Sequence, residues 1–269
     1  MMRVAVPGCA GRMGRALVQA VSAAEDMTLS GASEARGSAA VGGDAGLCAG
    51  LSPLDVEVTD DLDRLLEGAD GVIDFTLPEV TGVLVPRCAG RGLPLVVGTT
   101  GLTEAHRATL EDAAGRIPVV FAPNMSIGVN VLLRLVQEAA RLLGPAYDLE
   151  IVEAHHNRKV DAPSGTALAL ARALAEATGD QGPLEQRGCY SRHGQIGARP
   201  PRQIGIQTVR GGDLVGEHTV MYLGHGERLE LTHRASSRQT FARGAVRALR
   251  WAAGRPPGLY SMQDVLGLS

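Results

Sequence analysis

Lys159 is the only lysine in the chain, and it lies four positions after His155 in the segment EAHHNRKVDAPSGTALALARAL, residues 153–174. Every other residue of the Lys/Arg kind is an arginine. A guanidinium keeps its proton at any workable pH, whereas a lysine ammonium can release it, and the pKa of a lysine moves readily with burial. A lone lysine beside a titratable histidine therefore indicates a site for proton transfer.

The same segment predicts a helix that begins near Ser164. Ser164 or a neighbour can cap this helix, and the residues from Ala167 onward favour helix formation. Backbone N–H groups at Gly165 and Thr166 then lie at the helix start, where they suit a carboxylate or a phosphate. His156 and Lys159 precede the helix and can close the same site from the loop. The segment thus indicates an acidic substrate.

The paired histidines do not indicate a metal site. His155 and His156 follow an alternating strand over residues 148–153, and adjacent side chains of an extended chain point to opposite sides. The chain has no HExxH motif and no cysteine suitably spaced to join them. We expect no metal.

A second set of residues predicts dinucleotide binding. The apolar run at residues 3–6 leads directly into PGCAGRMG, residues 7–14, with glycines spaced GxxGxxG. Gly8 permits a tight turn, Gly11 lets the backbone approach a pyrophosphate, and Gly14 packs a helix against the strand. Glu34 follows the second expected strand, where a carboxylate accepts hydrogen bonds from ribose hydroxyls. A bound nicotinamide would supply hydride on one side of a substrate that is protonated on the other.

Two further turns follow expected strands. Gly98-Thr99-Thr100 comes after Val96-Val97, and Ala122-Pro123-Asn124-Met125 comes after Phe121. In an open α/β sheet the ligand crevice lies at the carboxyl ends of the strands. Both turns therefore predict contacts to the nicotinamide half of a cofactor.

The elements that must position these residues fall into two patterns. Up to about residue 126, short apolar strands at 3–6, 72–75, 95–97 and 119–121 alternate with helical runs at 14–24, 62–66, 81–88 and 104–114. This predicts a Rossmann-like, doubly wound parallel sheet with helices on both faces. Afterwards come helices at 130–143 and 164–177, a long loop at 179–202, and alternating strands at 204–209, 218–223 and 228–233, which predict a smaller α+β domain with a mixed sheet.

Composition narrows the class of protein. The 269 residues are 45% hydrophobic and 20% charged, with a net charge of −3 and only 3% aromatic residues, which fits a globular protein and argues against nucleic-acid or membrane partners. No apolar stretch is long enough to span a membrane, and the N-terminus lacks the pattern of a signal peptide. The four cysteines have no chelating spacing and are interpreted as reduced thiols. We expect a cytoplasmic protein.

Taken together, the motifs resemble one enzyme family. The glycine loop, Gly98-Thr-Thr-Gly101, Ala122-Pro-Asn-Met-Ser126, the run from Glu153 to Ala167, and RGGDLVGEHT at residues 210–219 are similar to segments of the dihydrodipicolinate (4-hydroxy-tetrahydrodipicolinate) reductases. The resemblance covers the whole chain. It implies that His155 is the proton donor and acceptor, that Lys159 is the second proton donor, and that His156, Gly165 and Thr166 hold the substrate carboxylates.

The resemblance also implies a cofactor site, domain boundaries and an assembly. The tail after about residue 237 would return to the dinucleotide-binding domain, giving residues 1–126 with 237–269 for that domain and 127–236 for a substrate-binding and oligomerisation domain. A homotetramer would form through the second domain's sheet. The residues expected to contact NADH or NADPH are Gly8, Cys9, Ala10, Gly11, Arg12, Met13, Glu34, Gly98, Thr99, Thr100, Ala122, Pro123, Asn124 and Met125.

The expected activity is therefore NAD(P)H-dependent reduction of a cyclic dicarboxylic acid in lysine and diaminopimelate biosynthesis. Two alternatives remain at this point, another two-domain amino-acid-pathway reductase and a non-catalytic dinucleotide sensor. The sequence departs from the family at Ala35, where an arginine commonly follows the glutamate, and Arg36 comes one position later. In an extended segment that offset turns the Arg36 side chain to the other face, so we expect NADH to be favoured.

Overall fold

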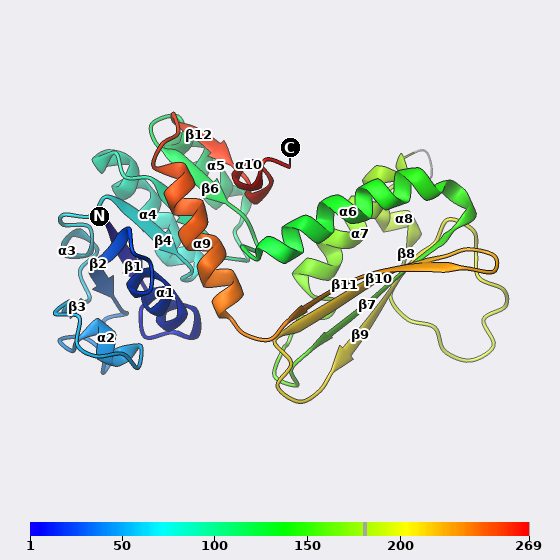
Figure 1. The fold of residues 1–269 in the computed structure, drawn as a ribbon, viewed down its shortest axis with the longest axis horizontal. Helices are drawn as coiled ribbons and strands as arrows, with labels where there is room; N and C mark the ends of the chain where they lie inside the picture. Colours follow the sequence, from blue (N-terminus) through cyan, green and yellow to red (C-terminus); the bar gives the residue numbers. More distant parts are fainter. Residues whose placement is uncertain (180–181, 269) are drawn as a thin grey trace. The chain divides into compact units, whose positions relative to one another are not determined.

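The computed structural model describes residues 1–179 and 182–268. Within these ranges the chain divides into two compact units, the first formed by residues 1–127 and 238–269 and the second by residues 128–237 (Figure 1). The C-terminal segment thus belongs to the same unit as the N-terminal one. Each unit has its own sheet and its own core.

The first unit is built on a seven-stranded parallel sheet in the order β12-β6-β5-β4-β1-β2-β3. Its strands are short, and the central strands β4 and β5 are wholly buried, as expected of a parallel sheet covered on both faces. Their bounds are β1 (Met2–Pro7), β2 (Met27–Ser33), β3 (Val58–Thr59), β4 (Gly71–Asp74), β5 (Leu95–Val97), β6 (Pro118–Phe121) and β12 (Gly258–Tyr260).

Helices cover both faces of this sheet. On one face Val4 and Ile73 pack with Leu17 of α1 and Leu249 of α9, whereas the next strand positions, such as Ala5, pack with α4 and α5 on the other face. The helices are α1 (Arg12–Ser22), α2 (Ala45–Cys48), α3 (Leu62–Leu65), α4 (Pro78–Arg91), α5 (Glu104–Ala114), α9 (Gln239–Ala252) and α10 (Met262–Leu266). The predicted doubly wound architecture is confirmed.

The second unit contains a mixed sheet, as predicted, and this sheet has five strands in the order β11-β10-β7-β9-β8. Strand β7 pairs in parallel with β9 and antiparallel with β10, which also pairs antiparallel with β11. The strands are β7 (Asp148–His155), β8 (Gly188–Cys189), β9 (Ile204–Arg210), β10 (Gly216–Leu223) and β11 (Arg228–Ala235). The helices are α6 (Ile127–Leu143), the short η1 (Gly144–Ala146), α7 (Gly165–Ala177) and α8 (Leu184–Arg187). The first residue of α6 belongs to the first unit.

Strand β7 shows how the sequence pattern builds the core of this unit. Alternate residues are buried, beginning with Leu149 and Ile151, which pack in one cluster with Val136 of α6 and Leu170 of α7. The hydroxyl of Tyr222 on β10 donates a 2.6 Å hydrogen bond to the carbonyl oxygen of Val136. Because side chains alternate along a strand, the buried face continues into Glu153 and His155, which carry polar groups.

The segment expected to be a long loop is partly structured. It contains α8 and β8, which are too short to show a periodic pattern in the sequence. Their stability comes from contacts distant in sequence, since the buried guanidinium of Arg187 donates to the carbonyl oxygen of Arg202 at 2.7 Å and to the Thr178 hydroxyl at 2.8 Å. Positions 180 and 181, within the same expected loop, lie outside the described residues.

Candidate active site

The candidate site of the second unit lies on the helix-covered face of its sheet. The backbone register places His233, His218, Glu153 and Thr208 opposite one another on the four neighbouring strands β11, β10, β7 and β9. His155, two residues after Glu153 on the same face, is opposite Arg210. Two neighbouring sets of cross-strand residues on this face of the sheet therefore carry polar side chains close to the start of α7.

Glu153 is the centre of this cluster, and its side chain is completely buried. Oε2 lies 2.6 Å from Nδ1 of His155 and accepts from Arg210 Nη1 at 2.8 Å. Oε1 accepts from Arg210 Nη2 at 2.8 Å, from the Ser164 N–H at 3.0 Å and from the Thr208 hydroxyl at 3.2 Å. Burial alone would raise the pKa of Glu153, but the hydrogen bonds from His155 and Arg210 hold it well below its ordinary value.

Ser164 joins the cluster to the start of α7. Its hydroxyl caps the helix by accepting from the Ala167 N–H at 3.1 Å and also lies 3.1 Å from Nε2 of His218. Gly165 and Thr166, the residues expected to bind carboxylates, form the first turn of the helix, and Gly165 is exposed. This turn has the charge polarity that attracts anions.

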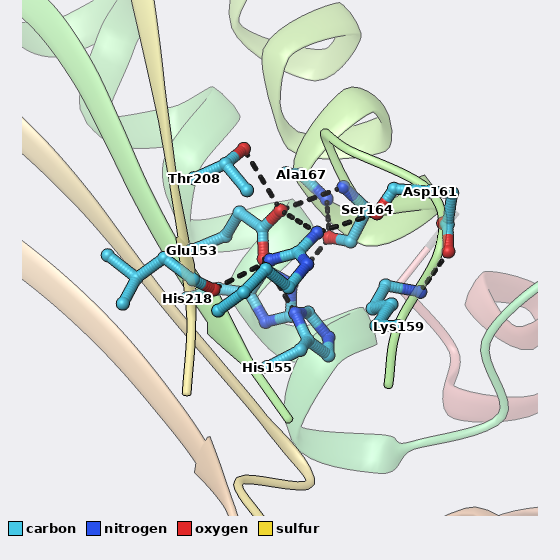
Figure 2. A network of polar contacts seen from close by, with 10 residues as sticks. Glu153, His155, Lys159, Asp161, Ser164, Ala167, Thr208 and His218 are labelled. Carbon is cyan, nitrogen blue, oxygen red and sulfur yellow. Dashed lines mark hydrogen bonds and ion pairs between the residues drawn. The ribbon is translucent and has the colours of Figure 1, made fainter. Parts of the chain in front are cut away.

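Lys159 lies in the loop between β7 and α7. Nζ forms an ion pair with Asp161 at 2.9 Å, and the Lys159 N–H donates to the carbonyl oxygen of His156 at 3.1 Å. The N–H of His156 in turn donates to the carbonyl oxygen of Leu214 at 2.8 Å, so the loop is fixed to the segment before β10. Figure 2 shows Lys159 and Asp161 on one side of Ser164, with Glu153 and His155 on the other.

All five residues expected to act on the substrate therefore belong to one continuous segment between the end of β7 and the first turn of α7. The partners that surround them were not expected as site residues. Glu153 could have been found from the alternation of β7, which places it on the same face as His155. Arg210 and His218 lie in the segment RGGDLVGEHT, which resembles the family but was given no role at the site, because their contacts with Glu153 and Ser164 depend on how β9 and β10 pair with β7.

In the first unit, the glycine loop connects β1 to α1. Gly8 has a positive φ of 65°, and a Cβ at Gly14 would collide with the carbonyl oxygen of Gly8, so both positions require glycine. The Ala10 N–H donates to Glu34 Oε1 at 2.8 Å, which links the loop to the end of β2. Burial and the nearby Glu34 carboxylate raise the pKa of the Cys9 thiol to about 12. Cys9 is completely buried and its N–H donates to the carbonyl oxygen of Ser33 at 3.0 Å, so its thiol is not a reactive group.

A cavity of about 490 Å³ adjoins this loop. Its lining includes Gly8 and Gly11 of the loop, Glu34, and the apolar side chains of Phe75 and Val80. Apolar walls beside a glycine loop and a carboxylate at the end of the second strand fit the adenosine end of a dinucleotide. Of the other predicted loop residues, Arg12 is exposed and Met13 is half-buried.

Arg36 lines the same cavity as Glu34 and Ala35, so the expectation that it points away is wrong. The physical reason is that β2 ends at Ser33, and the Ser38 N–H donates to the carbonyl oxygen of Ala35 at 3.0 Å. The chain turns at Arg36, and strand alternation no longer applies there.

The turns after β5 and β6 follow neighbouring parallel strands. Thr99 is buried, with its hydroxyl 2.9 Å from that of Thr81, which donates to Asp74 at 2.6 Å, whereas Thr100 is exposed. The Gly98 N–H donates to the carbonyl oxygen of Asp74 at 2.8 Å. The buried Asp74 carboxylate was not expected from the sequence, and burial raises its pKa.

The turn after β6 offers mainly backbone groups. Asn124 Oδ1 accepts from the Ser126 N–H at 2.9 Å, and Met125 is completely buried in the core. The Ala122 N–H donates to the carbonyl oxygen of Val97 at 3.2 Å, and Pro123 is exposed. A cofactor contact by Met125 would therefore involve its main chain.

A parallel nucleotide-binding sheet and a second unit with its own acid–base cluster define a class of protein. Enzymes of this class are two-domain oxidoreductases, which bind a dinucleotide on one domain and an acidic substrate on the other.

Comparison with known proteins identifies the family. Residues 2–125 match the model of the dihydrodipicolinate reductase N-terminus, and residues 128–266 match that of its C-terminus. The 4-hydroxy-tetrahydrodipicolinate reductase of Anaeromyxobacter sp. strain Fw109-5 is 58% identical over 100% of this chain and 98% of its own, and that of Alkalilimnicola ehrlichii is 56% identical over 99% of both. A dipicolinate-bound dihydrodipicolinate reductase from Paenisporosarcina sp. TG-14 superimposes with a TM-score of 0.76 at 25% identity, covering 98% of each chain.

The chain belongs to the dihydrodipicolinate reductase family. It is therefore an NAD(P)H-dependent reductase of lysine and diaminopimelate biosynthesis, and the two alternatives, another pathway reductase and a dinucleotide sensor, are set aside. None of the described helices is long and apolar enough to cross a membrane. Among residues 1–179 and 182–268, no three His, Cys, Asp or Glu side chains gather in a way that could hold a metal ion.

Proposed function

We propose that this chain reduces 4-hydroxy-tetrahydrodipicolinate to tetrahydrodipicolinate, with His155 and Lys159 as its proton-transferring residues. One observation supports this assignment above the others. The His155 ring is held by a buried carboxylate beside the first turn of α7, so an acid–base group adjoins a place suited to anions. The relatives at 58% and 56% identity carry the name of this activity.

The chemistry requires more than one proton transfer. Substrate and product differ by one oxygen atom, so the reaction releases water and adds one hydride and one proton. The reduced nicotinamide supplies the hydride when it is bound. Loss of water removes the hydroxyl, which requires an acid, together with a proton from the neighbouring carbon, which requires a base, and after hydride addition that carbon must receive a proton again. His155 and Lys159 provide two separate groups for these transfers.

The substrate carboxylates would bind at the start of α7. Gly165 and Thr166 offer main-chain N–H groups and a hydroxyl there, and His156 would contact a carboxylate from the loop. Lys159 adds a positive charge, although its ion pair with Asp161 partly offsets that charge before substrate arrives. This arrangement favours a dicarboxylic acid over a neutral ring.

NADH or NADPH would bind the first unit through residues 8–13, Glu34, 98–100 and 122–125. Glu34 suits the ribose hydroxyls of NADH and repels the 2′-phosphate of NADPH. Because Ala35 supplies no arginine, we propose that both cofactors are used and that NADH is favoured. Arg36, which lines the same cavity, makes NADPH usable in spite of Glu34.

We further propose a homotetramer located in the cytoplasm, in keeping with the biosynthetic role of the family. The tetramer would form through the face of the second sheet opposite α6 and α7. Val209 lies on that face and is 48% exposed, and its neighbour across the ladder is Ala154. Light scattering on the purified chain, and on Val209→Glu, tests the assembly.

Cofactor oxidation tests the proposed activity. The purified chain is mixed with NADH and freshly generated 4-hydroxy-tetrahydrodipicolinate, and the loss of nicotinamide absorbance is followed with and without substrate. We expect substrate-dependent oxidation that falls about a hundredfold or more in His155→Gln. Absence of oxidation with either NADH or NADPH would contradict the proposed function.

A further inference from the structure

We propose that Glu153 is a positioning residue for His155, which holds the imidazole with its proton on Nδ1 and so leaves Nε2 to act on the substrate. The role of Nε2 depends on the function proposed above for His155, whereas the orientation of the ring does not. The contact that carries this inference is the 2.6 Å distance between His155 Nδ1 and Glu153 Oε2, deep in the second unit (Figure 2).

The protonation pattern follows from the partner. An ionised carboxylate can only accept hydrogen bonds, so an imidazole nitrogen in contact with it must carry the proton. Although burial favours the neutral acid, the hydrogen bonds from His155, Arg210 and the Ser164 N–H lower the pKa of Glu153 and keep it ionised. Nδ1 of His155 is therefore the donor, and Nε2 is the nitrogen that can exchange protons with a substrate.

The carboxylate is fixed in its orientation as well as in its charge. Oε2 has His155 and Arg210 Nη1 as donors, and Oε1 has Arg210 Nη2, Ser164 N–H and Thr208 Oγ1. These donors come from β7, β9 and the residue that caps α7, and they occupy about all the acceptor sites a carboxylate offers. Rotation of Glu153 would break bonds to three elements at once, so the histidine has a rigid support.

Arg210 also offsets the negative charge of the Glu153 carboxylate. The guanidinium lies 2.8 Å from both carboxylate oxygens and compensates the charge of Glu153. The other groups near the ring are His218 on β10, whose ring centroid lies 5.1 Å away, and the Lys159–Asp161 ion pair of the loop. His218 faces His233 on β11. Burial and the nearby His155 lower the pKa of His218 to about 3, so it adds no charge near neutral pH.

The surroundings of Nε2 agree with this assignment. A Cβ at Gly216, the first residue of β10, would lie 2.9 Å from His155 Nε2, too close for an ordinary contact. A residue larger than glycine at this position would therefore crowd Nε2, whereas Nδ1 contacts Glu153.

The first test reads the ring directly and needs no substrate. In protein labelled with ¹⁵N-histidine, the seven histidines give separate imidazole signals, and His155→Gln identifies the signals of His155. We expect Nδ1 to be protonated and Nε2 to be unprotonated at neutral to alkaline pH, and Glu153→Gln to change this to a mixture of tautomers or to Nε2–H. A wild-type ring with its proton on Nε2 would overturn the proposal, even if the enzyme is active.

The second test uses kinetics with a matched control. Glu153→Gln should lower kcat about tenfold to a thousandfold and move the alkaline limb of the pH profile to lower pH, because the half-buried guanidinium of Arg210 then faces the ring without compensation. Glu150→Gln is the control, since Glu150 lies on the other face of β7 and also binds an arginine, Arg192, through both oxygens at 2.8 and 2.9 Å. The control should retain the wild-type pH profile.

A double variant separates positioning from folding. If Glu153 acts through His155, Glu153→Gln should change the remaining activity of His155→Gln less than about twofold. A full additional loss in that background, or a wild-type pH profile in Glu153→Gln, would refute the positioning role while the wild-type activity still supports the proposed function. Glu153→Asp, which keeps the charge but not the reach, should resemble Glu153→Gln in kcat and keep its alkaline limb closer to wild type.

Discussion

The hydroxyl of Ser164 lies 3.1 Å from Nε2 of His218, although the two residues are 54 positions apart in the chain. The same hydroxyl accepts the N–H of Ala167 and so caps α7. His218 is 3% exposed, and its ring meets that of His155 edge-on. Helix start, buried histidine and proposed proton donor therefore form one structural unit, and a change in the charge of His218 would disturb all three.

This relationship predicts acid sensitivity. Burial and the nearby His155 lower the pKa of His218 from 6.5 to about 3. Between these two values the unfolded chain binds a proton at His218 and the folded chain does not. The stability contributed by a neutral His218 is complete above pH 6.5 and is lost as the pH falls toward 3, with a slope of up to about 1.4 kcal/mol per pH unit. Urea unfolding between pH 7 and pH 5 should show this slope in the wild type.

His218→Gln should flatten this dependence, and His225→Gln, at an exposed histidine of the β10–β11 turn, should not. Glu153 contributes in a different window. Its pKa is below the ordinary 4.5, so its stabilisation is lost only as the pH falls through and below that value. Equal slopes above pH 5 in the wild type and in His218→Gln would show that His218 is not the responsible group.

The lone lysine gives a second prediction. Lys159→Arg keeps the positive charge near Asp161 but removes a transferable proton, so kcat should fall about tenfold or more while the substrate KM changes little. Steady-state kinetics across pH would measure both constants. Asp161→Asn removes the ion pair and leaves the lysine, and it should retain most of kcat. Near-normal turnover in Lys159→Arg would mean that only the charge matters.

A third prediction concerns the start of α7. Thr166→Val removes a hydroxyl that would bind the substrate equally in the ground state and the transition state, so KM should rise about threefold to thirtyfold with little change in kcat. Thr109→Val, at a half-buried threonine of α5 in the first unit, is the control and should leave KM unchanged. Pyridine-2,6-dicarboxylate should inhibit competitively against substrate. Inhibition competitive with the cofactor alone would place the anion site elsewhere.

The fold and the site differed in how much of each could be predicted. Runs such as Val72-Ile73 and Leu95-Val96 are bounded by turn residues and lie in buried strands, so local pattern sufficed for the parallel sheet. The residues from His155 to Thr166 are close because they are neighbours in the chain, and a motif records that directly. Short elements such as α8 depend on distant contacts, including those of Arg187, and no local pattern encodes them.

Arg210 and His218 show which part of the site could not be predicted from the sequence. Arg210 reaches Glu153 across 57 positions because β9 pairs in parallel with β7 in one register, and a shift by one residue would turn it to the other face. Pairing and register are properties of the assembled sheet. Arg36 was misjudged for the opposite reason, since a local turn after β2 replaced the strand geometry that had been assumed.

The cofactor preference is the last prediction, and it depends on Glu34 and Arg36 together. The Glu34 carboxylate accepts from the Ala10 N–H at 2.8 Å and the Ala35 N–H at 3.2 Å, which holds it beside the glycine loop, where a 2′-phosphate would be repelled. One missing charge-assisted contact costs about 1.5–3 kcal/mol, or about ten- to a hundredfold in affinity. NADH should therefore have the higher kcat/KM at physiological salt, and Ala35→Arg should narrow the difference chiefly through the KM for NADPH.

Arg36→Ala should widen the same difference, because Arg36 lines the cavity and is the guanidinium available to a 2′-phosphate there. Arg15→Ala, at an exposed arginine of α1 outside the cavity lining, serves as the control for a general loss of positive charge and should leave the ratio unchanged. The ratio of kcat/KM for NADH and NADPH, measured at two salt concentrations for the wild type and the three variants, tests the proposed preference. If the wild type prefers NADPH and Arg36→Ala reverses that preference, the attraction of Arg36 outweighs the repulsion of Glu34, and the proposed preference is wrong.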